Sequence, residues 1–253
     1  MTVHFVGAGP GAADLLTVRA TRLLAAADVV LYPGTYLDPE VLSHVSPDAQ
    51  LIDTQDLDLD QITAHLMQAA SDGKDVVRLA SGDLSVYSAL AEQTRRLTAA
   101  GVDWDATPGV PAYAAAAALL GRELTVPMIS QSVVLTRTQA RSTAMPDAES
   151  LETFAATRAT LVLHLAITKT RELMARLEPA YGPDCPVVAV YRASQPEQQI
   201  LRASVATIAD AVEAAGLKQA AVILVGRALD PAAGGESYLY DAARDRQAKR
   251  LPG

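Results

Sequence analysis

The chain has 253 residues, half of them apolar and a fifth charged, and its formal net charge is −8. This composition is typical of a globular protein with a large core and excludes a disordered chain. The negative charge and an aromatic content of only 4% disfavour a nucleic-acid partner, so we expect a small-molecule ligand.

Neither a membrane span nor a disulfide framework is expected. The longest apolar runs, such as residues 112–120, fall well short of the roughly 18–20 residues of a spanning helix, and the first residues do not resemble a secretory leader. Cys185 is the single cysteine, which excludes an internal disulfide and a cysteine zinc cage. We therefore expect a cytoplasmic protein.

Strand-like and helix-like runs alternate through the first half. Strands are predicted at 3–6, 29–32, 51–53, 76–79 and 102–107, and helices at 14–27, 58–71, 85–100 and 113–120. Such βαβ alternation predicts an α/β domain whose mostly parallel sheet has helices on both faces.

A domain boundary is expected at 122/123, because helical periodicity fails across 121–130 and Pro127 blocks its return. The predicted domains are therefore 1–122 and 123–253. In the second, strands are expected at 132–136, 160–164, 221–225 and 237–240, and helices at 151–156, 168–180 and 205–215. Residues 186–194 and 198–205 suggest an antiparallel hairpin, which makes this sheet mixed. A polar tail follows from about 241.

The turn Gly7-Ala8-Gly9-Pro10-Gly11 follows the first strand, where a dinucleotide-binding loop would lie. Its spacing is GxGxG instead of GxGxxG, Pro10 lacks an amide, and the second strand ends in Tyr32-Pro33-Gly34 without an acidic residue. The alternative is that the glycines only permit a tight turn before Asp14 caps the next helix.

Hydrolase and metal motifs are missing. There is no GxSxG or HExxH, and the four histidines at 4, 44, 65 and 164 share no ligand spacing, so we expect no metal site. Cys185 is expected to be a small buried side chain. His164 is expected to be a hydrogen-bonded core histidine.

Seven blocks, in order, resemble the tetrapyrrole methylases, which use S-adenosylmethionine to methylate porphyrin-like rings. They are VGAGPG at 6–11, DVVLYPG at 28–34, VVRLASGDLSVY at 76–87, TPGVPAYAAAAALLGRELT at 107–125, TLVLHLA at 160–166, VVAVYRASQPEQQI at 187–200 and AVILVG at 221–226. Three stretches, LYPGTYLDPE, GRELTVPMISQSVVLTR and VYRASQPEQQI, are most similar to members acting on a corrin precursor of cobalamin biosynthesis.

The resemblance implies two α/β domains with the cofactor in the cleft between them. The first would supply the substrate trough and part of the cofactor site, and the second the rest of that site and the contacts of a homodimer. The implied ligands are S-adenosylmethionine, released as S-adenosylhomocysteine, and a tetrapyrrole.

Site residues are implied at matching positions. Those for the cofactor are Pro10, Gly82, Asp83, Leu84, Pro111, Ala112, Leu165, Ala220, Ala221 and Val222. Gly9 and Gly11 would border the substrate, and Arg192 is a candidate substrate contact. Asp83 and Arg192 are also the candidates for a catalytic role, which would consist of positioning.

The sequence departs from the family pattern in places. Leu84 replaces a common proline, Ser88 a glycine, Ala80 a frequent histidine and Pro111 a serine or threonine. The last change removes a hydroxyl group, so only main-chain contacts are expected from position 111.

Each of these residues has a structural alternative. Asp83 could cap a helix starting near Ser85, and Leu165, Ala112, Ala221 and Val222 have the composition of core residues. Because the substrate carries many carboxylates, cations are expected to gather around it. The candidates near strand or loop ends are Arg78, Arg122, Arg137, Arg141, Lys169, Arg192 and Arg227, with solvated surface charge as the alternative.

The sequence leaves the acceptor open. It does not separate a metal-free corrin precursor from one carrying cobalt, nor from uroporphyrinogen or a diphthamide intermediate. A nicotinamide-dependent oxidoreductase and a nucleotide-binding regulatory module remain alternatives from other classes.

Overall fold

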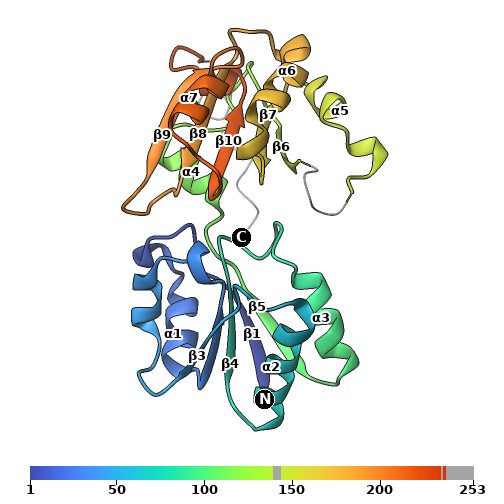
Figure 1. Cartoon of the computed structure of the whole chain (residues 1–253). Coiled ribbons are helices and arrows are strands. Elements are labelled where there is room, and N and C mark those ends of the chain that lie inside the picture. The colour runs from blue at the N-terminus through green and yellow to red at the C-terminus, as the bar shows by residue number, and fades with distance from the viewer. Residues whose placement is uncertain (139–143, 235, 238–253) are drawn as a thin grey trace, which may run out of the picture. The chain divides into compact units, whose positions relative to one another are not determined.

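The computed structural model describes residues 1–138, 144–234 and 236–237, and its chain forms two compact units (Figure 1). The first comprises Met1–Leu119 and Tyr191–Gln199, and the second comprises Leu120–Val190 and the chain from Ile200 onward. The division after residue 119 lies close to the expected boundary at 122/123. Residues 191–199 group with the first unit, although the strands that flank them in the chain belong to the second sheet.

The first unit contains a five-stranded sheet with the order β3-β2-β4-β1-β5. Its strands are β1 (Thr2–Gly7), β2 (Val29–Tyr32), β3 (Gln50–Asp53), β4 (Val76–Ala80) and β5 (Asp103–Thr107). All four pairings are parallel, with Phe5 opposite Arg78 and Val6 opposite Thr107. The carboxyl ends of the strands therefore meet at one edge, where open α/β sheets bind ligands.

Helices cover both faces of this sheet. The helices of the first unit are α1 (Val18–Ala26), α2 (Leu59–Ser71) and α3 (Leu90–Ala99), and α4 (Ala112–Leu120) follows β5. Leu24 of α1 packs with Val6 and Val30 on one face. On the other face, Leu66 of α2 and Leu97 of α3 pack with residues such as Phe5. Figure 1 shows α1 on one side of the sheet and α2 and α3 on the other.

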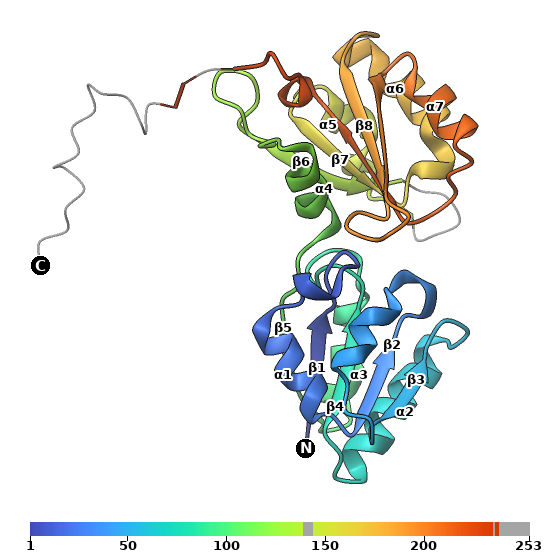
Figure 2. The same cartoon turned by 90° about the vertical axis from the view of Figure 1, so that its left-hand side faces the viewer.

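The second unit has a five-stranded mixed sheet with the order β6-β7-β10-β8-β9. Its strands are β6 (Val133–Arg137), β7 (Thr160–His164), β8 (Pro186–Tyr191), β9 (Gln199–Ser204) and β10 (Ala221–Val225), and its helices are α5 (Leu151–Ala155), α6 (Thr170–Tyr181) and α7 (Ile208–Ala214). β6 runs parallel to β7, whereas β10 runs antiparallel to it. Helix α6 packs against both α5 and α7 (Figure 2). The predicted fold class, with one parallel and one mixed sheet, is confirmed.

Two predicted helix starts were wrong by four residues or more. α1 begins at Val18 instead of residue 14, because the chain first makes a short 3₁₀ turn and the Thr17 side chain then accepts the Ala20 amide at 3.1 Å. Thr17, not Asp14, is therefore the N-cap. α3 begins at Leu90 instead of residue 85, because Tyr87 and Ala89 both have φ of +55°, which a right-handed helix cannot accommodate.

Some expectations fall outside the described residues. These are Arg141, most of the strand predicted at 237–240, and the polar tail from about 241. Over the described residues, every helix is too short or too polar to pass through a lipid bilayer.

Candidate functional site

Two amides of the glycine turn, those of Ala8 and Gly9, are used inside the protein. Ala8 N donates to Ala80 O at 2.8 Å, Gly9 N donates to Gly82 O at 3.0 Å, and Gly82 N donates to Gly9 O at 2.7 Å. Pro10 has no amide hydrogen, and α1 starts only at Val18. A dinucleotide loop needs free amides at a helix N-terminus, so this geometry argues against a pyrophosphate site here.

Gly7 and Gly109 allow the ends of three strands to come into backbone contact. A Cβ atom at Gly7 would lie 2.4 Å from Gly109 N, and one at Gly109 would lie 2.2 Å from Gly82 O. These glycines end or follow β1, β5 and β4, respectively. A side chain at position 7 or 109 would push these backbones apart, so the glycines serve close approach.

Asp83 ties two of these loops together. Its Oδ1 accepts the Ser85 amide at 2.9 Å and the Ser85 hydroxyl, and its Oδ2 accepts the Gly109 amide at 2.9 Å. Partial burial alone would raise the pKa of Asp83, but these hydrogen bonds together hold it below its usual value. Asp83 is therefore an ionised loop-positioning residue, and the alternative that it caps a helix at Ser85 is wrong because α3 starts at Leu90.

Most of the cofactor residues expected in the first unit come together around Gly82. A Cβ atom at Gly82 would lie 3.8 Å from Ala112 N and 3.9 Å from Pro111 Cα, and the turn with Pro10 pairs with Gly82 through Gly9. Leu84 is only 7% exposed and packs in the core with Leu97. Only the backbone of Leu84 is therefore open to a ligand.

The 191–199 segment lies against the glycine turn. Ser194 Oγ accepts the Ala12 amide at 3.1 Å, and Gln195 Nε2 donates to Pro10 O at 3.0 Å. A Cβ atom at Gly11 would lie 2.2 Å from Gln195 Cγ. Sequence reasoning missed Ser194 and Gln195, because the run SQPEQ gives only a turn signal.

Arg192 belongs to the same segment, three positions before Gln195, which lies against the predicted substrate residue Gly11. Its Nη1 lies 3.2 Å from Glu197 Oε2, and its guanidinium lies 5.7 Å from the centre of the Tyr191 ring. Its φ of +43° is left-handed. Among the described residues, Glu197 is the ion-pair partner of Arg192. An ion pair with an exposed carboxylate is weak, so a second anion can compete with Glu197.

The remaining residues expected to hold the cofactor lie in the second unit. β7 and β10 pair with Leu163 opposite Ile223, and continuing this register places Leu165 opposite Ala221. Leu165 is 63% exposed with φ of +52°, and Ala220 has φ of +51°. An exposed leucine in a left-handed conformation is unfavourable for folding, which is typical of functional sites. Val222 is buried, so only its backbone is available.

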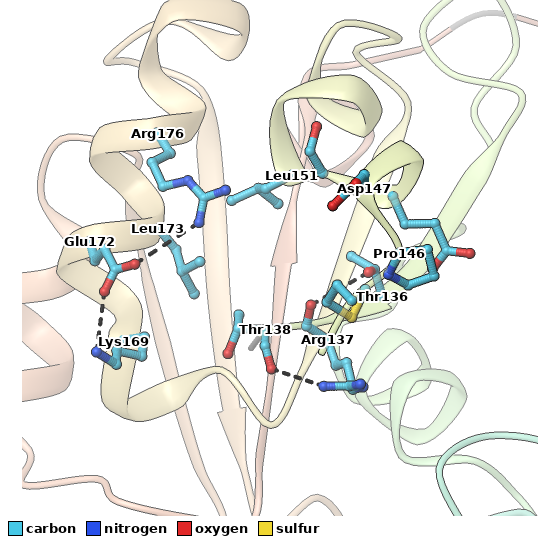
Figure 3. Close-up of a pocket in the computed structure, with 13 residues that line it drawn as sticks. Thr136, Arg137, Thr138, Pro146, Asp147, Leu151, Lys169, Glu172, Leu173 and Arg176 are labelled. Carbon is cyan, nitrogen blue, oxygen red and sulfur yellow. Dashed lines mark hydrogen bonds and ion pairs between the residues drawn. The ribbon is translucent and has the colours of Figure 1, made fainter. Parts of the chain in front are cut away.

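A pocket of about 250 Å³ lies within the second unit (Figure 3). Its lining residues include Thr138, Arg137, Lys169, Glu172 and Arg176. Glu172 lies 3.3 Å from Lys169 and 3.9 Å from Arg176, so acidic partners already offset these two cations. Thr138 Oγ1 donates to Leu165 O at 3.3 Å, which links the pocket wall to Leu165.

The other candidate cations lie in different surroundings. Arg78 is 9% exposed, whereas Arg227 is exposed and Arg122 half-buried. The interpretation of Arg78 as solvated surface charge is therefore wrong.

The side chains expected in the core are at least partly buried. Cys185 is 1% exposed, and burial raises the pKa of its thiol. Burial also lowers the pKa of His164. Within the parts of the chain that the structure describes, no three His, Cys, Asp or Glu side chains gather in a metal-binding arrangement.

Comparison with known proteins assigns the chain to one family. Residues 2–209 match the model of a family described as tetrapyrrole (corrin/porphyrin) methylases. A protein of Rhodococcus erythropolis named precorrin-4 C(11)-methyltransferase is 52% identical over 97% of this chain and 99% of its own length.

Two solved structures are also similar over most of their length. The X-ray structure of a cobalamin biosynthetic enzyme, cobalt precorrin-4 methyltransferase, has a TM-score of 0.88 and 38% identity, covering 91% of this chain and 96% of its own. Uroporphyrin-III C-methyltransferase from Thermus thermophilus, complexed with S-adenosylhomocysteine, has a TM-score of 0.76 and 27% identity, covering 90% and 99%.

Proposed function

Because this chain belongs to the tetrapyrrole (corrin/porphyrin) methylase family, we propose that it methylates precorrin-4 at C-11, giving precorrin-5 in cobalamin biosynthesis. The methyl donor is S-adenosylmethionine, which leaves as S-adenosylhomocysteine. The observation that carries the proposal is the 52% identity, over nearly the full length of both chains, to a protein with this name. The related structure with bound S-adenosylhomocysteine supports the choice of donor.

The residues expected to hold the cofactor suit this donor chemically. Ala112 is the first residue of α4, so its amide has no partner within that helix, and it lies beside Gly82. Leu165 offers exposed apolar surface. Ligand sites commonly combine apolar walls with a few main-chain hydrogen bonds. In this proposal Pro10, Gly82, Asp83, Leu84, Pro111, Ala112, Leu165, Ala220, Ala221 and Val222 hold S-adenosylmethionine. When bound, it supplies an activated methyl group on a positively charged sulfur.

The protein's own contribution to the reaction is alignment. Transfer to a ring carbon needs the carbon, the methyl group and the sulfur in line, and positioning alone is worth about 7–11 kcal/mol in favourable cases. Asp83 fixes the Gly82 loop against Gly109, and Gln195 fixes Pro10. Gly9 and Gly11 border the macrocycle, and Arg192 receives one of its carboxylates. No protein nucleophile is needed for this chemistry.

The alternatives differ in the acceptor. Precorrin-4 carrying cobalt is the nearest, and the lower identity of 38% to the cobalt precorrin-4 methyltransferase favours the metal-free substrate. Uroporphyrinogen III is less favoured, because the identity to the structure named uroporphyrin-III C-methyltransferase is only 27%. A nicotinamide-dependent oxidoreductase is disfavoured by the internal hydrogen bonds of the glycine turn.

The decisive experiment supplies the purified protein with S-adenosylmethionine carrying a ¹³C methyl group. Precorrin-4, its cobalt form and uroporphyrinogen III are offered separately, and products are examined by mass spectrometry and NMR. We expect methylation at C-11 of metal-free precorrin-4. Methylation of uroporphyrinogen III alone, or of none of the three rings, would overturn the proposal.

Donor choice has a separate test. S-adenosylhomocysteine and NAD are compared by thermal shift, where a ligand at 100 times its Kd stabilises by about 2.7 kcal/mol. We expect a shift with S-adenosylhomocysteine only. A shift with NAD only would favour the oxidoreductase.

We also propose that the protein is a cytoplasmic homodimer. The family resemblance supports the dimer, and so do exposed apolar side chains such as Met128, which is 92% exposed. Light scattering with Met128→Ser as a comparison tests this. Cys185, as a free buried thiol, agrees with a reducing compartment, and cell fractionation tests that placement.

A further inference from the structure

Arg78 is a buried guanidinium whose protein partners are all neutral. The residue is 9% exposed, and its Nε donates to Gln93 Oε1 at 3.2 Å. Its Nη1 donates to Thr54 Oγ1 at 3.2 Å and to Leu79 O at 3.0 Å. Within the described residues these bonds involve Nε and Nη1, which leaves both N–H groups of Nη2 for a further acceptor.

The two side-chain partners are themselves held in place. Thr54 Oγ1 donates to Tyr32 O at 3.0 Å, so its lone pairs face the guanidinium. Gln93 Nε2 donates to Ala89 O at 3.1 Å, which orients Oε1 toward Arg78. Thr54 is 6% and Gln93 is 3% exposed. The guanidinium therefore sits in a preorganised network that fixes its direction.

The charge of Arg78 lacks compensation. Burial lowers its pKa to about 10, so it remains a cation at neutral pH. Arg96, Arg171 and Arg176 each lie within ion-pair distance of a carboxylate, whereas Arg78 forms no ion pair within the part of the chain that the structure describes. Proteins normally pair such a buried charge, because taking it out of water is unfavourable.

The position of Arg78 connects it to the glycine cluster. It lies two residues before Ala80, whose carbonyl accepts the Ala8 amide, or about 7 Å along the strand. Thr54 directly follows β3, and Tyr32 ends β2. Arg78 therefore lies toward the carboxyl edge of the parallel sheet, where ligands bind in open α/β folds.

We propose that Nη2 of Arg78 binds a side-chain carboxylate of the tetrapyrrole, which supplies the missing counter-charge. This inference rests on the proposed function, because that substrate class brings the carboxylates. Arg78 then selects for an acidic side chain on the ring, and it makes no contact with the methyl donor. A guanidinium fixed by three other hydrogen bonds is suited to such a directional contact.

The test measures two ligands separately on four proteins. Wild type, Arg78→Met, Arg78→Lys and the control Arg95→Met, which removes an exposed arginine of the same unit, are titrated with uroporphyrin III by fluorescence. The same proteins are titrated with S-adenosylhomocysteine by calorimetry. We expect Arg78→Met to weaken uroporphyrin III binding about tenfold or more and Arg78→Lys to weaken it less. Arg95→Met, and all S-adenosylhomocysteine affinities, should stay within about twofold of wild type.

Other outcomes distinguish a failure of the Arg78 site from a failure of the proposed function. Unchanged uroporphyrin III affinity in Arg78→Met, or an equal loss of both ligands, would overturn the Arg78 site and assign the residue a structural role. If Arg78→Met does not fold, Arg78→Lys decides, because lysine keeps the charge but loses the fork of donors; wild-type affinity in it would reject the site. A wild type that binds neither ligand and methylates no ring would reject the proposed function itself.

Discussion

Gln195 donates a hydrogen bond from Nε2 to the carbonyl oxygen of Pro10 at 3.0 Å, across 185 positions of the chain. Beside it, Ser194 Oγ accepts the Ala12 amide. The 191–199 segment, which is distant in the chain, thus holds the glycine turn that follows β1. In a reaction that depends on alignment, this contact is expected to matter more for substrate binding than for folding.

Gln195→Ala should loosen the glycine turn. The variant removes one hydrogen bond, which is worth about 1 kcal/mol of unfolding free energy, and it should raise the KM for the tetrapyrrole several-fold. Hydrogen exchange at residues 8–12 and steady-state kinetics measure the two effects. Gln50→Ala, at an exposed position of β3, is the control. Unchanged exchange at residues 8–12 would count against a holding role for Gln195.

Gly11→Ala and Gly7→Ala should both destabilise the protein, but only the first should be rescued. At Gly11 the added Cβ meets the Gln195 side chain at 2.2 Å, whereas at Gly7 it meets backbone atoms of Gly109 at 2.4 Å. Each collision costs about 1–3 kcal/mol. Adding Gln195→Ala should recover part of the loss in Gly11→Ala, and none in Gly7→Ala. Urea unfolding of the four single and double variants measures this, and equal recovery in both would show that the contact is misplaced.

The alternation of strands and helices in the sequence predicted the fold class, because the hydrophobic pattern of each βαβ unit is visible within a short stretch of the chain. The start of α3 could not be predicted, since nothing in SGDLSVYSA indicates that Tyr87 and Ala89 take left-handed conformations. Thr17 displaced Asp14 as the α1 cap because Asp14 lies inside the 3₁₀ turn Ala13–Leu15, which precedes the helix.

Some residues of the candidate site could be predicted from the sequence, and others could not. Pro111 and Leu165 entered the candidate site only through the resemblance to a family, whereas Asp83 was also indicated by its place at the carboxyl end of a strand. Their role in binding stays a prediction. The contacts that hold the neighbouring loops could not be predicted. Gln195, which donates to Pro10 O, is 185 positions away in the chain, and the close approach of Gly7 to Gly109 is visible only in three dimensions. Arg78 was a candidate substrate cation with solvated surface charge as the alternative. Its burial could not be predicted, because Thr54 and Gln93, which hold its guanidinium, are 24 and 15 positions away in the chain.

Asp83→Asn should lower stability in a pH-dependent way. The variant keeps an acceptor for Ser85 but places an NH₂ group or a weaker acceptor against the Gly109 amide, at a cost of about 1–2 kcal/mol at pH 7. The wild-type carboxylate has a pKa held below its usual value, so its contribution is present above about pH 4 and is lost as pH falls through the folded-state pKa. The stability gap between the two proteins should therefore close at acidic pH. Chemical unfolding between neutral and acidic pH measures the gap, with the exposed Asp103→Asn as control; a gap independent of pH would show that the charge of Asp83 is irrelevant.

Leu165 should show opposite effects on stability and on ligand binding. Leu165→Gly relieves the left-handed strain and should raise the unfolding free energy by up to about 1 kcal/mol, whereas Leu165→Ala keeps the strain and should not. Both variants remove exposed apolar surface and should weaken S-adenosylhomocysteine binding about tenfold. Thermal unfolding and calorimetry separate the two effects. Full affinity in both variants would remove Leu165 from the cofactor site.

Arg192 and Glu197 should act in opposite directions on substrate affinity. Arg192→Ala should weaken tetrapyrrole binding and leave S-adenosylhomocysteine affinity unchanged, because the contact that we propose for its guanidinium is with the ring carboxylates and not with the donor. Glu197 lies 3.2 Å from Arg192 and competes with those carboxylates, so Glu197→Gln should strengthen tetrapyrrole binding by a few-fold at low salt. Calorimetry with both ligands measures the pair of variants. If Glu197→Gln weakens binding as Arg192→Ala does, the ion pair holds the 191–199 segment in shape, and Arg192 supports the site without touching the substrate.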